Sequence, residues 1–200
     1  MEMKITMPGY RLHEYKLVVP LPETIGEKVT ELRNTLFEKY KVKSNQDLKP
    51  CLTLLSCFSY EKSEERLIAY LQQIAMGTDV FKVDVASFSA YPSHSIYINV
   101  ATKEPFHHIA KELKRGKRLL QVPAHEPLFF NEPQLMLAQN LKPFQFISMW
   151  LDCEHSAFSG KFMADAFLLL KRNSNHRYEI VRRMEFMNLP LQVAQGSLFA

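Results

Sequence analysis

A short pattern that occurs twice constrains the fold of this 200-residue chain more than any other feature of its sequence. Residues 50–54 read Pro-Cys-Leu-Thr-Leu and residues 133–137 read Pro-Gln-Leu-Met-Leu, so both follow the pattern Pro-x-Leu-x-Leu. Each copy comes after a predicted helix and a loop. A repeat of this kind predicts two related lobes that each contribute one equivalent strand.

The alternation inside each copy predicts which side chains meet. Residues two apart in a strand point to the same face of the sheet. Cys51 and Thr53 are therefore expected to project together, away from the leucines that follow each of them. Gln134 and Met136 are expected to do the same in the second copy. If the two strands border one cleft, these side chains converge in it.

The rest of the chain alternates between strand patterns and helix patterns. The strands are predicted at residues 15–21, 49–58, 133–138 and in two hairpins, one at 81–100 with its turn at 91–94 and one with arms 158–171 and 178–186 and its turn at 173–175. The helices are predicted at residues 22–40, 64–74, 105–115 and 143–156, the second capped by Ser63 and followed by Gly77. No linker interrupts the chain, so residues 1–200 are expected to form a single domain.

Composition narrows the class of protein. An apolar fraction of 46% and a charged fraction of 23% are ordinary for a globular protein. No apolar run is long enough to cross a membrane, and the N-terminus lacks the apolar core of a signal peptide. The cysteines Cys51, Cys57 and Cys153 form no CxxC pair, which favours a reducing cytoplasm over a disulfide framework. A net charge of +4 is too small to indicate a dedicated nucleic-acid binder.

With these flanks, the two motifs resemble those of the 2H phosphoesterases, the superfamily of 2′-5′ RNA ligases and cyclic phosphodiesterases. Its members carry a His-x-Thr motif in a strand of each lobe, commonly within Pro-His-hydrophobic-Thr-Leu. The resemblance extends over nearly the whole chain and includes residues 15–20, 81–100, 130–133 and 162–172 together with Tyr178. It implies an α+β fold that is bilobed, with two pseudo-repeated lobes whose antiparallel sheets flank a central cleft and whose helices lie outside.

The sequence departs from the family at the positions that carry its chemistry. Cys51 stands where the first motif histidine is expected, although the motif threonine is retained as Thr53. In the second motif, Gln134 and Met136 stand in place of the histidine and the threonine. Both histidines are therefore absent, and no residue of this chain is assigned as catalytic.

The resemblance implies what these losses mean. In the family, one histidine acts as general base and the other as general acid on a 2′,3′-cyclic phosphate or a 2′-5′ linkage, while the threonines hold the phosphate. Histidine suits this task because its pKa lies near neutrality. Glutamine has no titratable proton, and a free cysteine has a pKa of about 8.5. Each positioned acid or base contributes ~10²–10⁴-fold to rate, so little or no phosphodiesterase activity is expected.

Three hypotheses of function remain open. In the first, an impaired family member still binds a phosphorylated ligand, such as a nucleotide or an RNA end, with Thr53 holding the phosphate. In the second, the cleft supports altered phosphoesterase chemistry that uses Cys51 or another histidine, of which His125 is the first candidate. In the third, the cleft is filled by its own side chains and the fold serves a protein partner.

The candidate ligand-binding residues combine the motif positions with aromatic and imidazole side chains expected at the rim of the cleft. They are Thr53, Cys51, Gln134, Tyr91, His125 and Phe130. No glycine-rich phosphate loop and no metal-ligand spacing occurs in the sequence, so no cofactor and no metal are expected. The sequence does not predict the oligomeric state.

Overall fold

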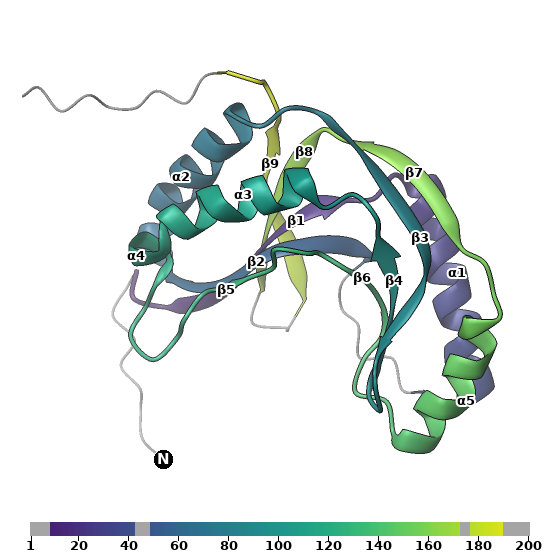
Figure 1. The fold of residues 1–200 in the computed structure, drawn as a ribbon. Coiled ribbons are helices and arrows are strands. Elements are labelled where there is room, and N and C mark those ends of the chain that lie inside the picture. Colours follow the sequence, from purple (N-terminus) through teal and green to yellow (C-terminus); the bar gives the residue numbers. More distant parts are fainter. Residues whose placement is uncertain (1–8, 43–48, 173–176, 190–200) are drawn as a thin grey trace, which may run out of the picture.

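Two antiparallel sheets form the centre of the molecule in the computed structural model, which describes residues 9–42, 49–172 and 177–189 (Figure 1). The five-stranded sheet has the order β5-β2-β1-β8-β9, formed by Leu128–Phe129, Cys51–Tyr60, Leu12–Pro20, Ala166–Arg172 and Tyr178–Glu185. The four-stranded sheet has the order β6-β4-β3-β7, formed by Leu135–Ala138, Ser95–Val100, Phe81–Tyr91 and Ser159–Ala164. The predicted α+β fold with two antiparallel sheets is confirmed.

The helices cover the outer faces of both sheets, and one helix from each sheet packs against the other sheet. Helix α1 (Glu23–Tyr40) follows β1 of the five-stranded sheet, yet it packs with α5 (Pro143–Glu154) against the four-stranded sheet. Helix α3 (Glu104–Arg115) follows β4 of the four-stranded sheet, yet it contacts β2 and β5. The remaining helical elements lie on the five-stranded sheet and are η1 (Glu61–Ser63), α2 (Glu64–Met76) and α4 (Lys117–Leu120). The two lobes therefore depend on each other for their cores.

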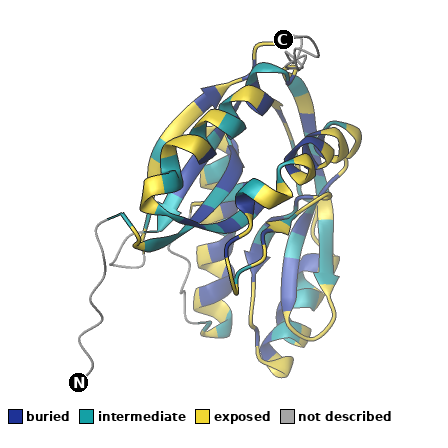
Figure 2. Ribbon diagram, turned by 90° about the vertical axis from the view of Figure 1, so that its left-hand side faces the viewer, coloured by how far each residue is buried: buried dark blue, intermediate teal, exposed yellow. Residues whose placement is uncertain are grey.

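Burial follows the predicted periodicities. Buried positions alternate with more accessible ones along much of β2, β4 and β7, and the exposed positions of the helices lie on their outer sides (Figure 2). In α1, the apolar stripe predicted from helical spacing is buried at Ile25, Val29, Leu36 and Phe37 and only partly buried at Leu32. Arg33 is buried with it. A charged residue in line with an apolar stripe is unusual, because burying a guanidinium removes its hydration.

The segment 158–171 corrects one prediction, because it is not one strand. It divides at Asp165 into β7, which pairs with β3, and β8, which pairs with β1 and β9. Apolar residues continue on both sides of Asp165, so the local pattern does not mark the point where the chain passes from one sheet to the other. The β8–β9 hairpin is present as predicted, and its predicted turn at 173–175 lies outside the described residues.

A second correction concerns the start of α2. The predicted cap Ser63 makes no side-chain capping hydrogen bond, because η1 precedes the helix and gives Ser63 a turning backbone with ψ of 0° instead of an extended one. The helix ends at Gly77 as predicted. None of the helices in the described part of the chain is both long and apolar enough to cross a bilayer.

Candidate functional site

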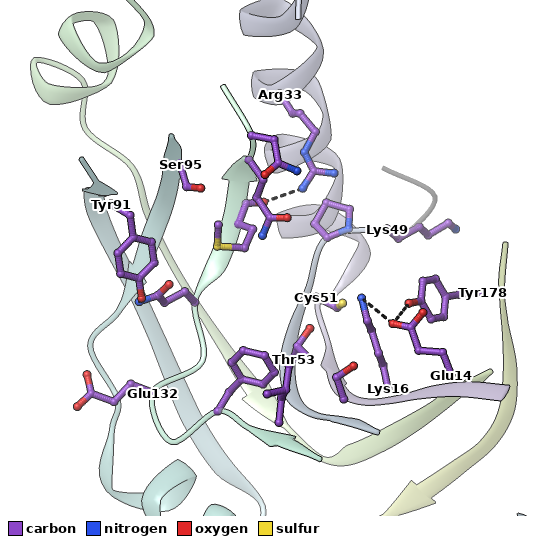
Figure 3. Close-up of a pocket in the computed structure, with 18 of the residues that line it drawn as sticks. Glu14, Lys16, Arg33, Lys49, Cys51, Thr53, Tyr91, Ser95, Glu132 and Tyr178 are labelled. Atoms are coloured by element: carbon purple, nitrogen blue, oxygen red, sulfur yellow. Dashed lines mark hydrogen bonds and ion pairs between the residues drawn. The ribbon is translucent and has the colours of Figure 1, made fainter. Parts of the chain in front are cut away.

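A cavity of about 690 Å³ lies between the two sheets and takes side chains from both of them. Cys51 and Thr53 reach it from β2, and Met136 reaches it from β6, with Gln134 just before that strand. All four motif positions therefore line one cavity, as the alternation predicted. Figure 3 shows Cys51 and Thr53 at its wall.

The leucines of the two motifs explain why these side chains point into the cavity. Leu52 and Leu54 are buried on the opposite face of β2, and Leu135 and Leu137 are buried on the opposite face of β6. Burial of an aliphatic side chain contributes roughly 1.5–3 kcal/mol to stability, and a slip by one residue would expose it. The buried leucines thus hold each strand in the register that turns the alternate residues to the cavity.

The first motif presents an uncharged thiol. Burial raises the pKa of the Cys51 thiol to about 11, although a hydrogen bond with Thr53 and the positive charges of Lys16 and Arg33 act in the opposite direction. A thiol with this pKa is almost entirely protonated near neutral pH, and the nucleophile and base is the thiolate. The arrangement does not prepare Cys51 for either role.

The second motif presents an amide and a thioether. The Gln134 amide Nε2 donates a hydrogen bond of 2.7 Å to the Tyr91 hydroxyl, so Gln134 and Tyr91 hold each other at the cavity wall. Neither Gln134 nor Met136 can exchange a proton near neutral pH. The side chains of the second motif therefore offer the cavity neither a general acid nor a general base.

Arg33 is a cavity residue that sequence reasoning missed. It reaches from α1 toward the space between the motif strands, and its Nη2 donates a hydrogen bond of 2.8 Å to the Met136 carbonyl (Figure 3). Burial lowers the pKa of its guanidinium, which nevertheless stays charged at neutral pH because arginine does not deprotonate in proteins. The available signal was its spacing of four residues from buried Val29, which places it on the buried stripe of α1.

A second group that the sequence analysis missed forms the opposite wall. Glu14 accepts hydrogen bonds from the Tyr178 hydroxyl (2.7 Å) and from Arg172 Nη1 (3.1 Å). The Lys16 ammonium lies 4.7 Å from the centre of the Tyr178 ring. These residues come from β1, β8 and β9, whose antiparallel pairing brings them together, so no local motif could indicate them.

The predicted rim residues divide into two sets. Tyr91 and Phe130 line the cavity, and a hydrogen bond of 2.9 Å from the Phe130 backbone N–H to the Leu54 carbonyl ties Phe130 to β2. His125 is not among the lining residues, because its ring packs on Phe58 with the centroids 4.3 Å apart. A different histidine, His94, lines the cavity from the β3–β4 turn.

Basic side chains outnumber acidic ones around the cavity. The basic residues are Lys16, Arg33, Lys49 and Arg172, and the acidic residues are Glu14 and Glu132. The Glu132 carboxylate forms an ion pair of 2.9 Å with Lys103, a residue that does not line the cavity. The lining therefore favours an anionic occupant. Within the described ranges, no group of three or more His, Cys, Asp or Glu residues is arranged to hold a metal ion.

Solved structures with the same fold are known. The structure of Escherichia coli LigT complexed with 3′-AMP matches with a TM-score of 0.60 and 12% identity, covering 88% of this chain and 98% of that one. The structure of TT0787 from Thermus thermophilus matches with a TM-score of 0.56 and 14% identity, covering 87% and 98%. A structure described as a phosphoesterase matches with a TM-score of 0.57 and 13% identity, covering 88% and 99%. At these identities, the likeness shows a shared fold.

The sequence comparisons point the same way. No curated protein sequence matches this chain significantly. The family model of the 2′-5′ RNA ligase superfamily matches residues 21–175, a span that includes both motif strands and most of the residues that line the cavity between them. This match covers most of the chain and agrees with the resemblance carried by the two Pro-x-Leu-x-Leu motifs, so the chain belongs to the 2′-5′ RNA ligase superfamily.

Proposed function

We propose that this chain binds a small phosphorylated ligand, a nucleotide or an RNA end, in the cavity between its sheets and has little or no phosphodiesterase activity. One observation carries the proposal: the cavity at which the two motif strands meet has an excess of basic side chains. Thr53 adds a hydroxyl at the position where the family uses threonine to hold phosphate, and Tyr91 and Phe130 offer aromatic surface at the rim.

The expected loss of activity follows from the groups that face the cavity. The motif positions hold a thiol whose pKa is about 11, an amide and a thioether, none of which serves as an acid–base pair at neutral pH. Binding needs only donors and positive charge, and these remain. The proposal thus assigns ligand binding to this chain without the acid–base catalysis that accompanies it in active relatives.

The related structures support a nucleotide as the ligand class. Escherichia coli LigT has been crystallised in complexes with 3′-AMP, with phosphate and with NADP+. We carry this class of ligand to the present chain because the cavity between its two motif strands has an excess of basic side chains, which suits an anionic phosphate. The free state of Cys51, Cys57 and Cys153 also fits the reducing cytoplasm in which we propose that the protein acts, as one domain.

The two alternative hypotheses have less support. Altered chemistry through Cys51 requires a thiolate, which the raised pKa of that thiol disfavours. A scaffold with a filled cleft requires the cavity to be packed shut, whereas about 690 Å³ is open between the sheets. We therefore retain the binding function as the proposal.

The test measures binding and turnover on the same preparation. Calorimetry with 3′-AMP and with adenosine is expected to show binding of the nucleotide and much weaker binding of the nucleoside. Incubation with 2′,3′-cyclic nucleotides is expected to give no product above the background of a folded but unrelated protein. Turnover comparable to that of an active relative would overturn the proposed loss of activity, and absence of nucleotide binding would overturn the proposed ligand.

A further inference from the structure

The Arg33 side chain is buried without the partners that a buried charge ordinarily has. The residue is 7% exposed. Its Nη2 donates to the Met136 carbonyl, while its Nε is buried and has no hydrogen-bond partner. Among the residues that the structure describes, no carboxylate lies within ion-pair distance of Arg33.

This arrangement is unfavourable in the unliganded protein. Burying a charged group is costly unless it is paired, and replacing such a group by an apolar one of similar size is often neutral or stabilising. The position itself suits an apolar residue, because Val29 and Leu36 continue the same buried stripe of α1. A buried polar atom without a partner calls for an explanation, and an anion bound in the adjoining cavity supplies one.

The location of Arg33 directs that anion to the motif strands. Its hydrogen bond to the Met136 carbonyl places the guanidinium against β6. Cys51 of β2 lines the same cavity as Arg33. An anion held by Arg33 would therefore lie where the family's two histidines and threonines act in active members.

The charges around the cavity indicate what kind of phosphate fits. The basic side chains that line it exceed the acidic ones by two. Arg33 and Lys49 have no acidic partner in the described part of the chain, whereas Glu14 is shared between Lys16 and Arg172. A phosphate monoester carries about −1.5 to −2 at pH 7, while a cyclic phosphate is a diester with a single negative charge. The monoester matches the lining better.

We propose that Arg33 is the residue that anchors the anion, and that the cavity takes a nucleotide with a terminal phosphate monoester in preference to the 2′,3′-cyclic phosphate. The proposal rests on the proposed function and deepens it. It assigns to this chain the chemical form of nucleotide that remains after a cyclic phosphate has been opened. The anchoring group comes from a helix outside both motifs, so the loss of the motif histidines leaves it unaffected.

Calorimetric titration of the full chain tests the preference directly. With 3′-AMP and 2′,3′-cyclic AMP as probes at pH 7.5, we expect the monoester to bind at least ~10-fold more tightly, as expected for an added charge-assisted contact. Lowering the pH to 5 protonates the monoester, whose second pKa is about 6, and is expected to weaken 3′-AMP binding while binding of the cyclic nucleotide barely changes. A cyclic nucleotide that binds as tightly as the monoester would overturn the inference.

Variants assign the preference to Arg33. Arg33→Met keeps the volume and the apolar character of the stripe, so we expect it to fold, because removal of the buried charge offsets the lost hydrogen bond to the Met136 carbonyl. We expect it to lose ~10–100-fold in affinity for 3′-AMP and much less for the cyclic nucleotide, so that the ratio of the two affinities falls toward one. The matched control Arg66→Met changes the same residue type on α2, outside the cavity, and should leave both affinities unchanged.

The outcomes separate this inference from the proposed function. If the wild type binds the monoester preferentially and Arg33→Met retains that preference, Arg33 is not the anchor. If neither nucleotide binds the folded wild type, the proposed function fails as well. Should Arg33→Met fail to fold, Arg33→Lys provides the test, because it keeps the charge but not the fork of donors: an intermediate affinity for 3′-AMP supports the anchor, and an unchanged affinity contradicts it.

Discussion

The two motif strands occupy very different places in their sheets. The first, β2, has ten residues and lies between β1 and β5, and it retains Thr53. The second, β6, has four residues and forms the edge of its sheet, and its motif carries Gln134 and Met136. Despite this contrast, the leucines of both strands are fully buried and both strands turn their alternate residues to the cavity.

The contrast teaches that the scaffold and the chemistry of a motif are separable. The buried leucines hold each strand, whereas the residues between them face the cavity and contribute little to the core. The edge strand has an additional support, because Arg33 donates to the Met136 carbonyl on the side of β6 that no strand covers. Changes at the cavity-facing positions are therefore expected to leave the fold intact.

Restoring the chemistry is the strongest test of this separation. The combined change Cys51→His, Gln134→His and Met136→Thr is expected to produce hydrolysis of 2′,3′-cyclic nucleotides, with each histidine contributing ~10²–10⁴-fold to rate. Product formation is followed by chromatography. The single change Cys51→His is the control, because it supplies one histidine without its counterpart and should give far less activity. A folded triple variant without turnover would mean that the substrate geometry was lost too.

Truncating a motif leucine tests whether the buried leucines, and not the cavity-facing residues, stabilise the two strands. Leu52→Ala in β2 and Leu135→Ala in β6 are each expected to lower the free energy of unfolding by about 2–5 kcal/mol, since both side chains are 0% exposed and truncation leaves a cavity. Denaturant titration measures the effect. Gln134→Ala is the matched change at a cavity-facing position and should cost less than about 1 kcal/mol. A cost for Gln134→Ala equal to that of Leu135→Ala would contradict the separation.

The reactivity of the Cys51 thiol tests whether the first motif holds an activated nucleophile. With a pKa of about 11, the thiol of the folded protein is expected to react with iodoacetamide near pH 7.5 roughly 10²-fold more slowly than a free thiol with a pKa of about 8.5. The pH dependence of stability has a defined sign: the folded state holds the proton more tightly than the unfolded state, so stability is retained below pH ~8.5 and falls as the pH rises toward 11. Mass spectrometry of labelled peptides resolves Cys51 from the other cysteines, and rapid labelling at pH 7.5 would show that the thiol is activated.

The smallest expected effect concerns the second motif. Tyr91→Phe removes the acceptor of the Gln134 amide but keeps the aromatic ring at the cavity rim. Because Tyr91 is 43% exposed, the unfolding free energy should fall by less than about 1 kcal/mol, and affinity for 3′-AMP should change by less than ~5-fold. Tyr97→Phe, which alters the neighbouring ring of β4, serves as the control. A large loss of affinity confined to Tyr91→Phe would show that its hydroxyl contacts the ligand.

The sequence by itself determined the features that repeat over short distances. Alternation in residues 50–54 and 133–137 predicted which side chains share a face, and the helical spacing in 22–40 predicted a buried stripe, because both periods follow from local backbone geometry. The absence of the motif histidines is likewise a property of the sequence, and so is the expectation that acid–base catalysis is lost.

Only the tertiary structure decided which distant residues meet. Strand pairing divided residues 158–171 between two sheets and brought Glu14 and Tyr178 to the cavity, while packing on Phe58 kept His125 away from its lining. The sequence indicated that the charged residue Arg33 lies on the apolar stripe of α1. It did not indicate the contact of Arg33 with the Met136 carbonyl, 103 residues away. Local periodicity sets the direction of a side chain relative to its own element, whereas the pairing and packing of elements far apart in the sequence determine what that side chain faces.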